Sequence, residues 1–366
     1  MNIECVKEKL VGAISKAEKI TSKNPTLPVL KCLLLEAKGG HLNIKATNLD
    51  LGVEIVVPAK VIQDGVIAVP GAILNGFLSN LPPEKSIKLE MIDGSLKVST
   101  SQSHALIKTY PIEDYPTIPK VSGGQVFSLP GKDFIKGLKS VWYSSAISSM
   151  KPELSSVLIK AENGFMVYAA TDAFRLAEKK IKAKNIGNFT QTLIPFRNVA
   201  EIVRIFDGVE GDFEIKTDAN QVSISTDSIY LFSRAVEGVF PDYRQIIPKE
   251  TTTEVVLLKQ DILNSLKTST VFSNAFNEVN LEIDPTAKIF HLTTKNNDVG
   301  ENENSLSAAL TGESLKINFN YKYLHDCFQS IDTDSISFSF AGLNKALIIK
   351  GVNDQSFMYL VMPMNK

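Results

Sequence analysis

An internal threefold repeat constrains this chain more than any other feature. Three segments, KEKLVGAISKAEKITSKN, GKDFIKGLKSVWYSSA and LKQDILNSLKTSTVFSN, share one pattern of lysines and apolar residues. In the first, Leu10, Ile14 and Ala17 recur at helical spacing, which predicts an amphipathic helix in each segment. Thr47 and Thr171 mark equivalent points 124 residues apart, and position 294 or 295 marks the third. A repeat of this length predicts three similar structural units.

Each first helix is followed by strand-like runs, a second helix and a closing strand pair. The runs are rich in β-branched residues and are broken by turn signals such as Gly39-Gly40, Asn163-Gly164 and Asp93-Gly94. Pro70 and Pro195 fall at the first turn of two second helices, where a missing N–H costs little. The six helices are predicted at 7–23, 70–80, 130–145, 195–207, 257–274 and 320–330.

Two similar exit sequences separate the repeats. PIEDYPTIPK at 111–120 and FPDYRQIIPK at 240–249 both carry Asp-Tyr followed by Pro-Lys. We read them as the ends of the first and second repeats. The sequence therefore predicts an α+β protein of three domains, at 1–121, 122–249 and 250–366, each with two helices packed on antiparallel sheets.

Composition indicates an ordinary folded protein. Of 366 residues, 44% are hydrophobic and 22% are charged. The start lacks the pattern of a secretory signal, and no apolar run reaches the roughly 18 residues of a spanning helix. Cys5, Cys32 and Cys327 are too far apart to suggest a disulfide framework or a thiolate metal site. We therefore expect a cytoplasmic protein with no membrane partner.

Motifs of common enzyme classes are missing from the sequence. It has no glycine-rich phosphate loop, and its four histidines show no zinc-binding spacing. The most enzyme-like string is ATDAFRLA at 170–177, which brings Thr171, Asp172 and Arg175 together. An Asp-Arg pair without a nucleophile more often orders a turn, although acid/base or phosphate chemistry by Asp172 and Arg175 remains an alternative. We expect no catalytic residue, metal site or cofactor.

Charge is divided between the predicted helices and the rest of the chain. The six helix ranges hold 13 Lys and Arg against 7 Asp and Glu, which leaves 26 against 33 elsewhere, while the whole chain has a net charge of −1. If the helices lie on one side, that side attracts phosphate and the other repels it. Ordinary solvated helix faces are the alternative interpretation.

Several strings resemble a known family. NPTLPVL at 24–30, ATDAFRLA, FPDYRQIIPK and the C-terminal VMPM are similar to the bacterial DNA polymerase III β subunits, the replicative sliding clamps. The resemblance spans the whole chain. It implies a DNA-clamp fold in which two chains close head to tail into a ring around duplex DNA. A ring of this kind is a non-catalytic processivity factor that slides on the duplex and holds other proteins there.

The resemblance also implies a peptide-binding cleft between the second and third domains. Partners would be the DNA polymerase III catalytic subunit, the clamp loader, other polymerases and mismatch-repair or ligase proteins, each docking a short hydrophobic motif. Met and Pro side chains suit an adaptable apolar groove, with Arg175 as a rim charge. The residues carried over by local match are Leu154, Thr171, Phe174, Arg175, Leu176, Pro241, Ile246, Ala346, Val361, Met362, Pro363 and Met364.

Duplex contacts and the ring interface are carried over in the same way. The DNA contacts would be Lys23, Asn24, Lys136, Lys139, Arg197, Arg204 and Lys267, and the homodimer interface would hold Ile107, Val271 and Phe272. The family often has Arg before PTLP as a contact to duplex DNA. This chain has Lys23 and Asn24 there, so we assign that contact to Lys23. After Met364 the chain has Asn365-Lys366, where an Arg is more usual in the family, and this difference affects which partner motifs the cleft would prefer. A repeat-built scaffold that binds proteins without encircling DNA is the second alternative.

Overall fold

The computed structural model describes residues 1–21, 27–148, 150–183, 191–218 and 220–364. These residues form two compact units. Unit 1 comprises Met1–Ile135 and Arg197–Ala235, and unit 2 comprises Lys136–Phe196 and Val236–Lys366. The division therefore passes through the second sequence repeat, which contributes to both units.

The first repeat has the predicted helix, strands and second helix, but it begins with a strand before the first helix and closes with three strands, not the predicted pair. Alternating burial in its strands, as in Leu51, Val53 and Ile55, places one face in the core. The elements are β1 (Asn2–Val6), α1 (Lys7–Glu18), the 3₁₀ helix η1 (Pro28–Lys31), β2 (Cys32–Lys38), β3 (His41–Thr47), β4 (Leu51–Gln63), β5 (Gly65–Pro70), α2 (Gly71–Ser79), β6 (Ser86–Ile92), β7 (Ser95–Ser99) and β8 (His104–Lys108).

The second repeat has the same order. Its first helix is shorter than the predicted 130–145, because Trp142–Ser144 continues as a tighter 3₁₀ turn, a common way for a helix to end. The elements are β9 (Gln125–Pro130), α3 (Gly131–Val141), η2 (Trp142–Ser144), β10 (Ser156–Glu162), β11 (Phe165–Thr171), β12 (Arg175–Lys182), β13 (Thr192–Pro195), α4 (Phe196–Phe206), β14 (Asp212–Asp218), β15 (Gln221–Ser225) and β16 (Ile229–Arg234).

The third repeat differs in one respect: two short strands stand where the first repeat has the single long β4. The linker before it holds η3 (Tyr243–Ile246). The elements are β17 (Thr253–Leu258), α5 (Lys259–Thr270), β18 (Glu278–Asp284), β19 (Ile289–Asn296), β20 (Gly300–Ser305), β21 (Ala308–Gly312), β22 (Leu315–Asn320), α6 (Tyr321–Cys327), η4 (Phe328–Ser330), β23 (Ser335–Phe340), β24 (Leu347–Gly351) and β25 (Phe357–Val361).

Unit 1 is built on one 12-stranded antiparallel sheet. Its main path runs β8-β7-β6-β1-β4-β16-β15-β14-β9, with β2, β3 and β5 attached beside it. The 13-residue β4 holds the sheet together, because Leu51–Ile55 pairs with β16 while Ala59–Gln63 pairs with β1. The last strand of the second repeat thereby joins the fourth strand of the first.

Unit 2 contains the equivalent junction between the second and third repeats. Its nine-stranded sheet runs β13-β10-β11-β12-β25-β24-β23-β17-β21, and a separate four-stranded sheet runs β20-β19-β18-β22. Here β25, the last strand of the third repeat, pairs with β12, in the register Arg175↔Val361 to Lys179↔Phe357. At both junctions, the last strand of one repeat thus pairs with the fourth strand of the repeat before it.

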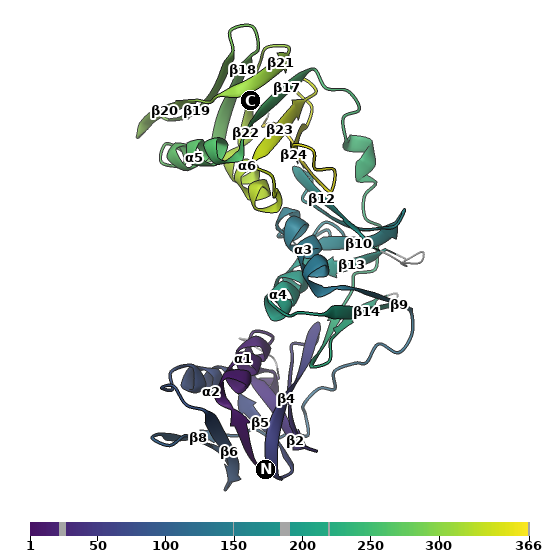
Figure 1. The fold of residues 1–366 in the computed structure, drawn as a ribbon, viewed down its shortest axis with the longest axis vertical. Helices are drawn as coiled ribbons and strands as arrows, with labels where there is room; N and C mark the ends of the chain where they lie inside the picture. The colour runs from purple at the N-terminus through teal and green to yellow at the C-terminus, as the bar shows by residue number, and fades with distance from the viewer. Residues whose placement is uncertain (22–26, 149, 184–190, 219, 365–366) are drawn as a thin grey trace. The chain divides into compact units, whose positions relative to one another are not determined.

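Helices cover the sheets closely. In unit 1, α1 and α2 lie side by side (Figure 1), and α1 buries Leu10, Ile14 and Ala17 as the sequence spacing predicts. In unit 2, a Cβ atom at Gly137 of α3 would overlap the ring of the fully buried Tyr168 on β11. Glycine at 137 therefore allows the helix to approach the strand directly.

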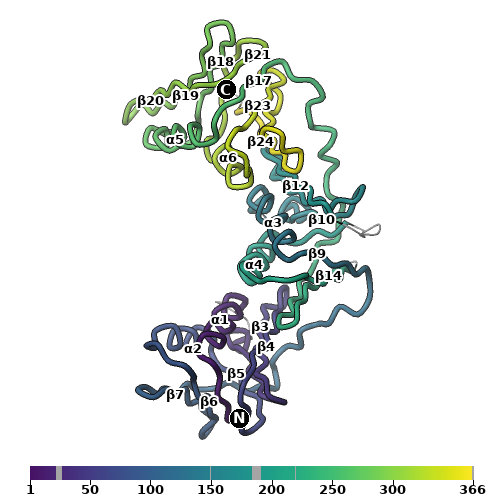
Figure 2. The backbone as a smooth tube through the Cα atoms, in the orientation of Figure 1, coloured from purple at the N-terminus to yellow at the C-terminus, as the bar shows by residue number. Residues whose placement is uncertain are grey.

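The segment linking the second and third repeats is fastened to unit 2 by side chains. Figure 2 shows residues 236–252 (green) as an extended stretch before β17. Tyr243 is buried and donates its hydroxyl to Glu178 Oε2 at 2.5 Å, and Arg244 pairs with Glu162 on β10. Because the tyrosine is buried and lies beside the Glu178 carboxylate, its pKa is raised. The exit sequence read from the repeat is therefore an anchored linker.

Candidate functional site

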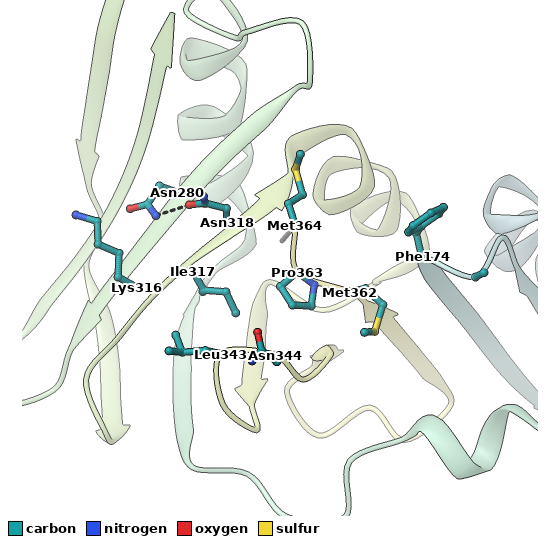
Figure 3. Close-up of a pocket in the computed structure, with 11 residues that line it drawn as sticks. Phe174, Asn280, Lys316, Ile317, Asn318, Leu343, Asn344, Met362, Pro363 and Met364 are labelled. Carbon is teal, nitrogen blue, oxygen red and sulfur yellow. Dashed lines mark hydrogen bonds between the residues drawn. The ribbon is translucent and has the colours of Figure 1, made fainter. Parts of the chain in front are cut away.

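A pocket of about 850 Å³ in unit 2 is lined by the C-terminal tail, the β18–β22 face and two loops (Figure 3). Met362, Pro363 and Met364 form its central wall, and Phe174 lies at one end. The Phe174 side chain is 61% exposed, so its ring is available for contact. The full lining is Ala173, Phe174, Asn280, Lys316, Ile317, Asn318, Leu343, Asn344, Met362, Pro363 and Met364.

Backbone hydrogen bonds fix the tail within this pocket. Strand β25 ends at Val361, which pairs with Arg175. Beyond it, the Met362 N–H donates to the carbonyl of Phe174 at 2.8 Å, and the Met364 N–H donates to the carbonyl of Asn318 at 2.8 Å. The tail therefore bridges β12 and β22, and its two methionine side chains are presented from a backbone held at both ends.

Polar groups from β18 and β22 also line the pocket. Asn280 Nδ2 donates to Asn318 Oδ1 at 2.5 Å, and Asn318 Nδ2 donates to Glu278 Oε1 at 2.5 Å. Lys316 Nζ lies 2.6 Å from Glu282 Oε2. A pocket lined by both flexible thioethers and amides can hold apolar side chains of a peptide while hydrogen bonding to its polar groups.

The Asp172–Arg175 pair orders the turn before β12, as the sequence indicates. Asp172 Oδ1 accepts the backbone N–H groups of Phe174 and Arg175, both at 3.0 Å, and Arg175 Nε donates to Asp172 Oδ2 at 3.0 Å. The guanidinium also contacts Asp326 Oδ2 at 2.6 Å and lies 4.4 Å from the ring centre of Tyr323 on α6.

These contacts change the interpretation of Arg175. Burial alone would lower its pKa, but Tyr359, Asp326 and Asp172 outweigh that effect and raise it. The guanidinium, which is 10% exposed, is neutralised by two carboxylates. Arg175 therefore acts as a bridge between the turn and α6, and its side chain does not present a free charge at the pocket rim.

The other predicted cleft residues lie outside the lining of this pocket. Leu176 and Ala346 are buried in an apolar cluster against which Met362 packs, and Val361 is fully buried. Thr171 is buried, and its hydroxyl donates to the carbonyl of Arg175. Leu154 is half-buried, while Pro241 and Ile246 are exposed on the linker.

Strands far along the chain supply the lining residues that the sequence analysis missed. These are Asn280 on β18, Lys316, Ile317 and Asn318 on β22, and Leu343 and Asn344 on the loop before β24, together with Ala173. The alternation in EVNLEID and LKINFN places Asn280 and Asn318 on an outward face. The pairing that brings those strands beside the tail leaves no local signal in the sequence.

The predicted DNA contacts fall on three helices. Lys136 and Lys139 lie on α3, Arg197 and Arg204 on α4, and Lys267 on α5, and all but the half-buried Lys139 are exposed. Arg204 makes two 2.7 Å contacts to Glu201, and Lys136 Nζ lies 2.6 Å from Asp332 Oδ2. Lys23 and Asn24 lie outside the described residues.

The predicted interface residues differ in their exposure. Ile107 on β8 is 6% exposed and points into unit 1, whereas its neighbour Leu106 is 64% exposed. Val271 after α5 is 71% exposed, and Phe272 is half-buried. The apolar surface on the β8 edge is therefore carried by Leu106.

Neither a metal site nor a membrane-spanning helix is found in the described residues. Within the described ranges, no group of three His, Cys, Asp or Glu side chains is placed to hold a metal ion. In the same part of the chain, no helix is both long and apolar enough to cross a membrane. The pocket and the charged helix faces are the features on which a functional assignment rests.

Comparisons with known proteins agree along the whole chain. Models of the N-terminal, central and C-terminal domains of the DNA polymerase III β subunit match residues 1–119, 128–242 and 244–365. The β sliding clamps of Synechococcus elongatus and Synechocystis are 26% and 28% identical, each match covering 99% of both chains.

Solved structures show the same fold. The DNA polymerase III β subunit of Thermotoga maritima aligns with a TM-score of 0.93 at 26% identity, covering 100% of this chain and 99% of the other. A Pseudomonas aeruginosa sliding clamp bound to griselimycin aligns with a TM-score of 0.94 at 23% identity, covering 100% of both chains. With three family models matching nearly its full length, this chain belongs to the DNA polymerase III β subunit family and has the three-domain sliding-clamp fold.

Proposed function

We propose that two copies of this protein close head to tail into a ring that encircles duplex DNA, slides along it and tethers replication proteins. The observation that supports the proposal is the way in which successive repeats pair their strands. The last strand of the second repeat pairs with β4, and the last strand of the third repeat pairs with β12. The last strand of the first repeat, β8, ends its sheet, with β7 as its partner.

The third repeat offers the complementary edge. Strand β20 pairs with β19 and ends the four-stranded sheet, and it corresponds to the part of β4 that receives β16. If β8 of one copy joins β20 of a second, the rule of the two internal junctions is repeated between chains. Two such contacts related by a twofold axis close the assembly and cover edges that would otherwise invite stray pairing.

Charge on the helices supports a duplex in the ring. The six α-helices of the described part hold 11 Lys and Arg against 6 Asp and Glu, although the chain as a whole carries −1. A modest excess of positive charge favours contacts to phosphates of any sequence without holding the protein at one place. Retention then depends on ring closure and not on affinity.

The pocket around Met362 supports the tethering role. It suits short hydrophobic motifs on the DNA polymerase III catalytic subunit, the clamp loader, other polymerases, and mismatch-repair or ligase proteins. We also propose that the protein has no catalytic activity of its own, that it works in the cytoplasm, and that its domains end at residues 121 and 249. The family assignment and the repeat support each of these points.

Retention on circular DNA tests the proposal. The protein would be loaded by a bacterial clamp loader and ATP onto a nicked circular plasmid and separated from free protein by gel filtration at high salt. We expect it to stay with the circle and to leave when the plasmid is cut once, because a linear duplex lets a ring slide off. Equal retention on circular and cut DNA, or none on either, would contradict encirclement and favour a scaffold that never surrounds the duplex.

A further inference from the structure

Three lysines lie on one face of helix α3, and one of them, Lys136, forms an ion pair with a carboxylate. Lys132, Lys136 and Lys139 are spaced i, i+4 and i+7, so they share one face of the helix. Lys136 Nζ lies 2.6 Å from Asp332 Oδ2, in the segment that follows η4. The two side chains are 48% and 62% exposed, so the pair lies on the surface where a phosphate could reach it.

The two residues before Asp332 are held by hydrogen bonds that do not involve Lys136. Two residues earlier, the Ser330 hydroxyl donates to the carbonyl of Ser140 on α3 at 3.0 Å, and Tyr143 Oη lies 3.1 Å from the same Ser330 oxygen. One residue earlier, Lys259 Nζ donates to the carbonyl of Ile331 at 2.7 Å. These contacts hold the backbone just before Asp332, whose carboxylate lies beside the Lys136 ammonium.

Electrostatics keeps this carboxylate ionised. The hydrogen bond from Lys136 lowers the pKa of Asp332, and the charges of Lys136, Lys179 and Lys259 lower it further. Asp332 is consequently negative at any pH at which DNA is replicated. The ammonium of Lys136 is then matched by a fixed negative charge before any DNA arrives.

We propose that Asp332 is a built-in counterion that withholds Lys136 from duplex phosphates and so limits the affinity of the α3 face for DNA. This inference rests on the proposed function, because it concerns the same encircled duplex. Each phosphate neutralised by a protein cation adds about 0.9 to the slope of log affinity against log salt. A ring that must move along DNA benefits when one lysine of the row makes no lasting phosphate contact, since tight contacts would slow the sliding.

A double-mutant cycle tests this directly. The full-length protein and its Asp332→Asn, Lys136→Gln and doubly substituted variants would be titrated against a short linear fluorescent duplex over a series of salt concentrations. Asp332→Asn should tighten binding at low salt by roughly threefold and steepen the salt slope by about 0.9, because one more lysine becomes available. Lys136→Gln alone should change little, and it should abolish the gain from Asp332→Asn.

Two further variants separate this role from simpler effects. Asp332→Glu keeps the charge and should stay close to wild-type affinity and slope. Glu282→Gln removes one carboxylate from the Lys316–Glu282 pair, which has the same 2.6 Å separation but lies on the four-stranded sheet, and it should leave duplex affinity unchanged. Circular dichroism and the mass of the assembly would confirm that each variant folds, as expected for an exposed ion pair that contributes little to stability.

Several outcomes would overturn the inference. A gain that persists in the Lys136→Gln background, or an equal gain from Glu282→Gln, would show that only net charge matters. A loss of about 0.9 in slope from Lys136→Gln alone would show that this lysine already contacts phosphate. If the wild-type protein neither binds the duplex at low salt nor stays on circular DNA, the proposed function fails together with this inference.

Discussion

The backbone N–H of Met362 donates to the carbonyl oxygen of Phe174 at 2.8 Å, one residue beyond the last pair of β12 and β25. This bond fastens the C-terminal tail to the turn that Asp172 and Arg175 hold in place. The Met362 side chain packs on the buried cluster below and also lines the pocket above. A binding wall of this kind is formed before a ligand arrives, which lowers the ordering cost of binding.

Truncating this wall should weaken peptide binding. We expect Met362→Ala to lower the affinity for a short hydrophobic peptide roughly tenfold, the typical effect of removing an anchor at the centre of an interface. The measurement is fluorescence anisotropy with a labelled peptide from a polymerase III catalytic subunit. Met91→Ala removes a methionine that is 41% exposed in unit 1 and should leave the affinity unchanged. Equal affinity for wild type and Met362→Ala would remove the pocket from the tethering role.

Removing the guanidinium of Arg175 should destabilise unit 2. Arg175→Met leaves the carboxylates of Asp172 and Asp326 without their shared partner, and loss of one partner of a buried pair costs about 3 kcal/mol. Denaturant unfolding followed by circular dichroism measures the loss. Arg204→Met breaks the contacts to Glu201 at a site where the arginine is 55% exposed, and its cost should stay below about 0.5 kcal/mol. Similar costs for the two variants would show that burial is not what gives the Arg175 bridge its strength.

Acid should release one anchor of the linker. The hydrogen bond from Arg244 lowers the pKa of Glu162 to about 2, so the stabilisation is complete above its usual value of 4.5 and is lost as the pH falls toward 2. Because both side chains are partly exposed, the contribution should be below about 1 kcal/mol. Wild type and Arg244→Gln should therefore differ in unfolding free energy at pH 6 and converge by pH 2. A difference that is constant over this range would exclude the Glu162 pair as its source.

Two glycine substitutions should have opposite effects. At Gly137, a Cβ would overlap the ring of Tyr168, so Gly137→Ala should cost about 1–3 kcal/mol by forcing α3 away from β11. At Gly76, in the middle of α2, a Cβ meets nothing within 4 Å, so Gly76→Ala should stabilise by about 0.5–1 kcal/mol. Thermal unfolding of both variants checks the pair. A tolerated Gly137→Ala would mean that α3 and β11 can separate at little cost.

Charge on the proposed interface should open the ring. Val271→Glu places a carboxylate on the apolar surface beside β20, and we expect it to convert a dimer of about 80 kDa, twice the 40.1 kDa chain, into monomer. Native mass spectrometry gives the answer. Ile147→Glu changes a similarly exposed apolar residue, with Ile147 at 78% and Val271 at 71%, and should leave the dimer intact. A dimer that survives Val271→Glu would place the contact elsewhere.

Sequence periodicity was sufficient to predict the repeating architecture. The repeat, the helix positions and turns such as Asp93-Gly94 follow from local patterns, and both of these residues take the positive φ that a tight hairpin needs. Helix ends were less predictable: α5 occupies Lys259–Thr270 within the expected 257–274, because terminal turns depend on packing as well as propensity. Local signals thus identified the elements better than their limits.

The candidate site was only partly predictable, for a different reason. Phe174 and the Met362–Met364 tail were identified because each lies within a short string that resembles the family, and both line the pocket. Asn280 and Asn318 enter the pocket through strand pairing of β18 with β22, which is a long-range contact. Likewise, the burial of Val361 and the bridging role of Arg175 depend on the β12–β25 register and on Asp326, more than a hundred residues away from Arg175.

The division of β4 into two strands in the third repeat has a mechanical consequence. In the first repeat, the continuous backbone of β4 is hydrogen bonded to β16 near one end and to β1 near the other. A pull on the junction with β16 is therefore transmitted along β4 to β1. In the third, β20 belongs to one sheet and β21 to another. A pull on β20 therefore reaches β21, and its partner β17, through the connecting residues Leu306 and Ser307. The outer edge of the third repeat can therefore yield while the nine-stranded sheet, which contains β25 and β12, keeps its pairing.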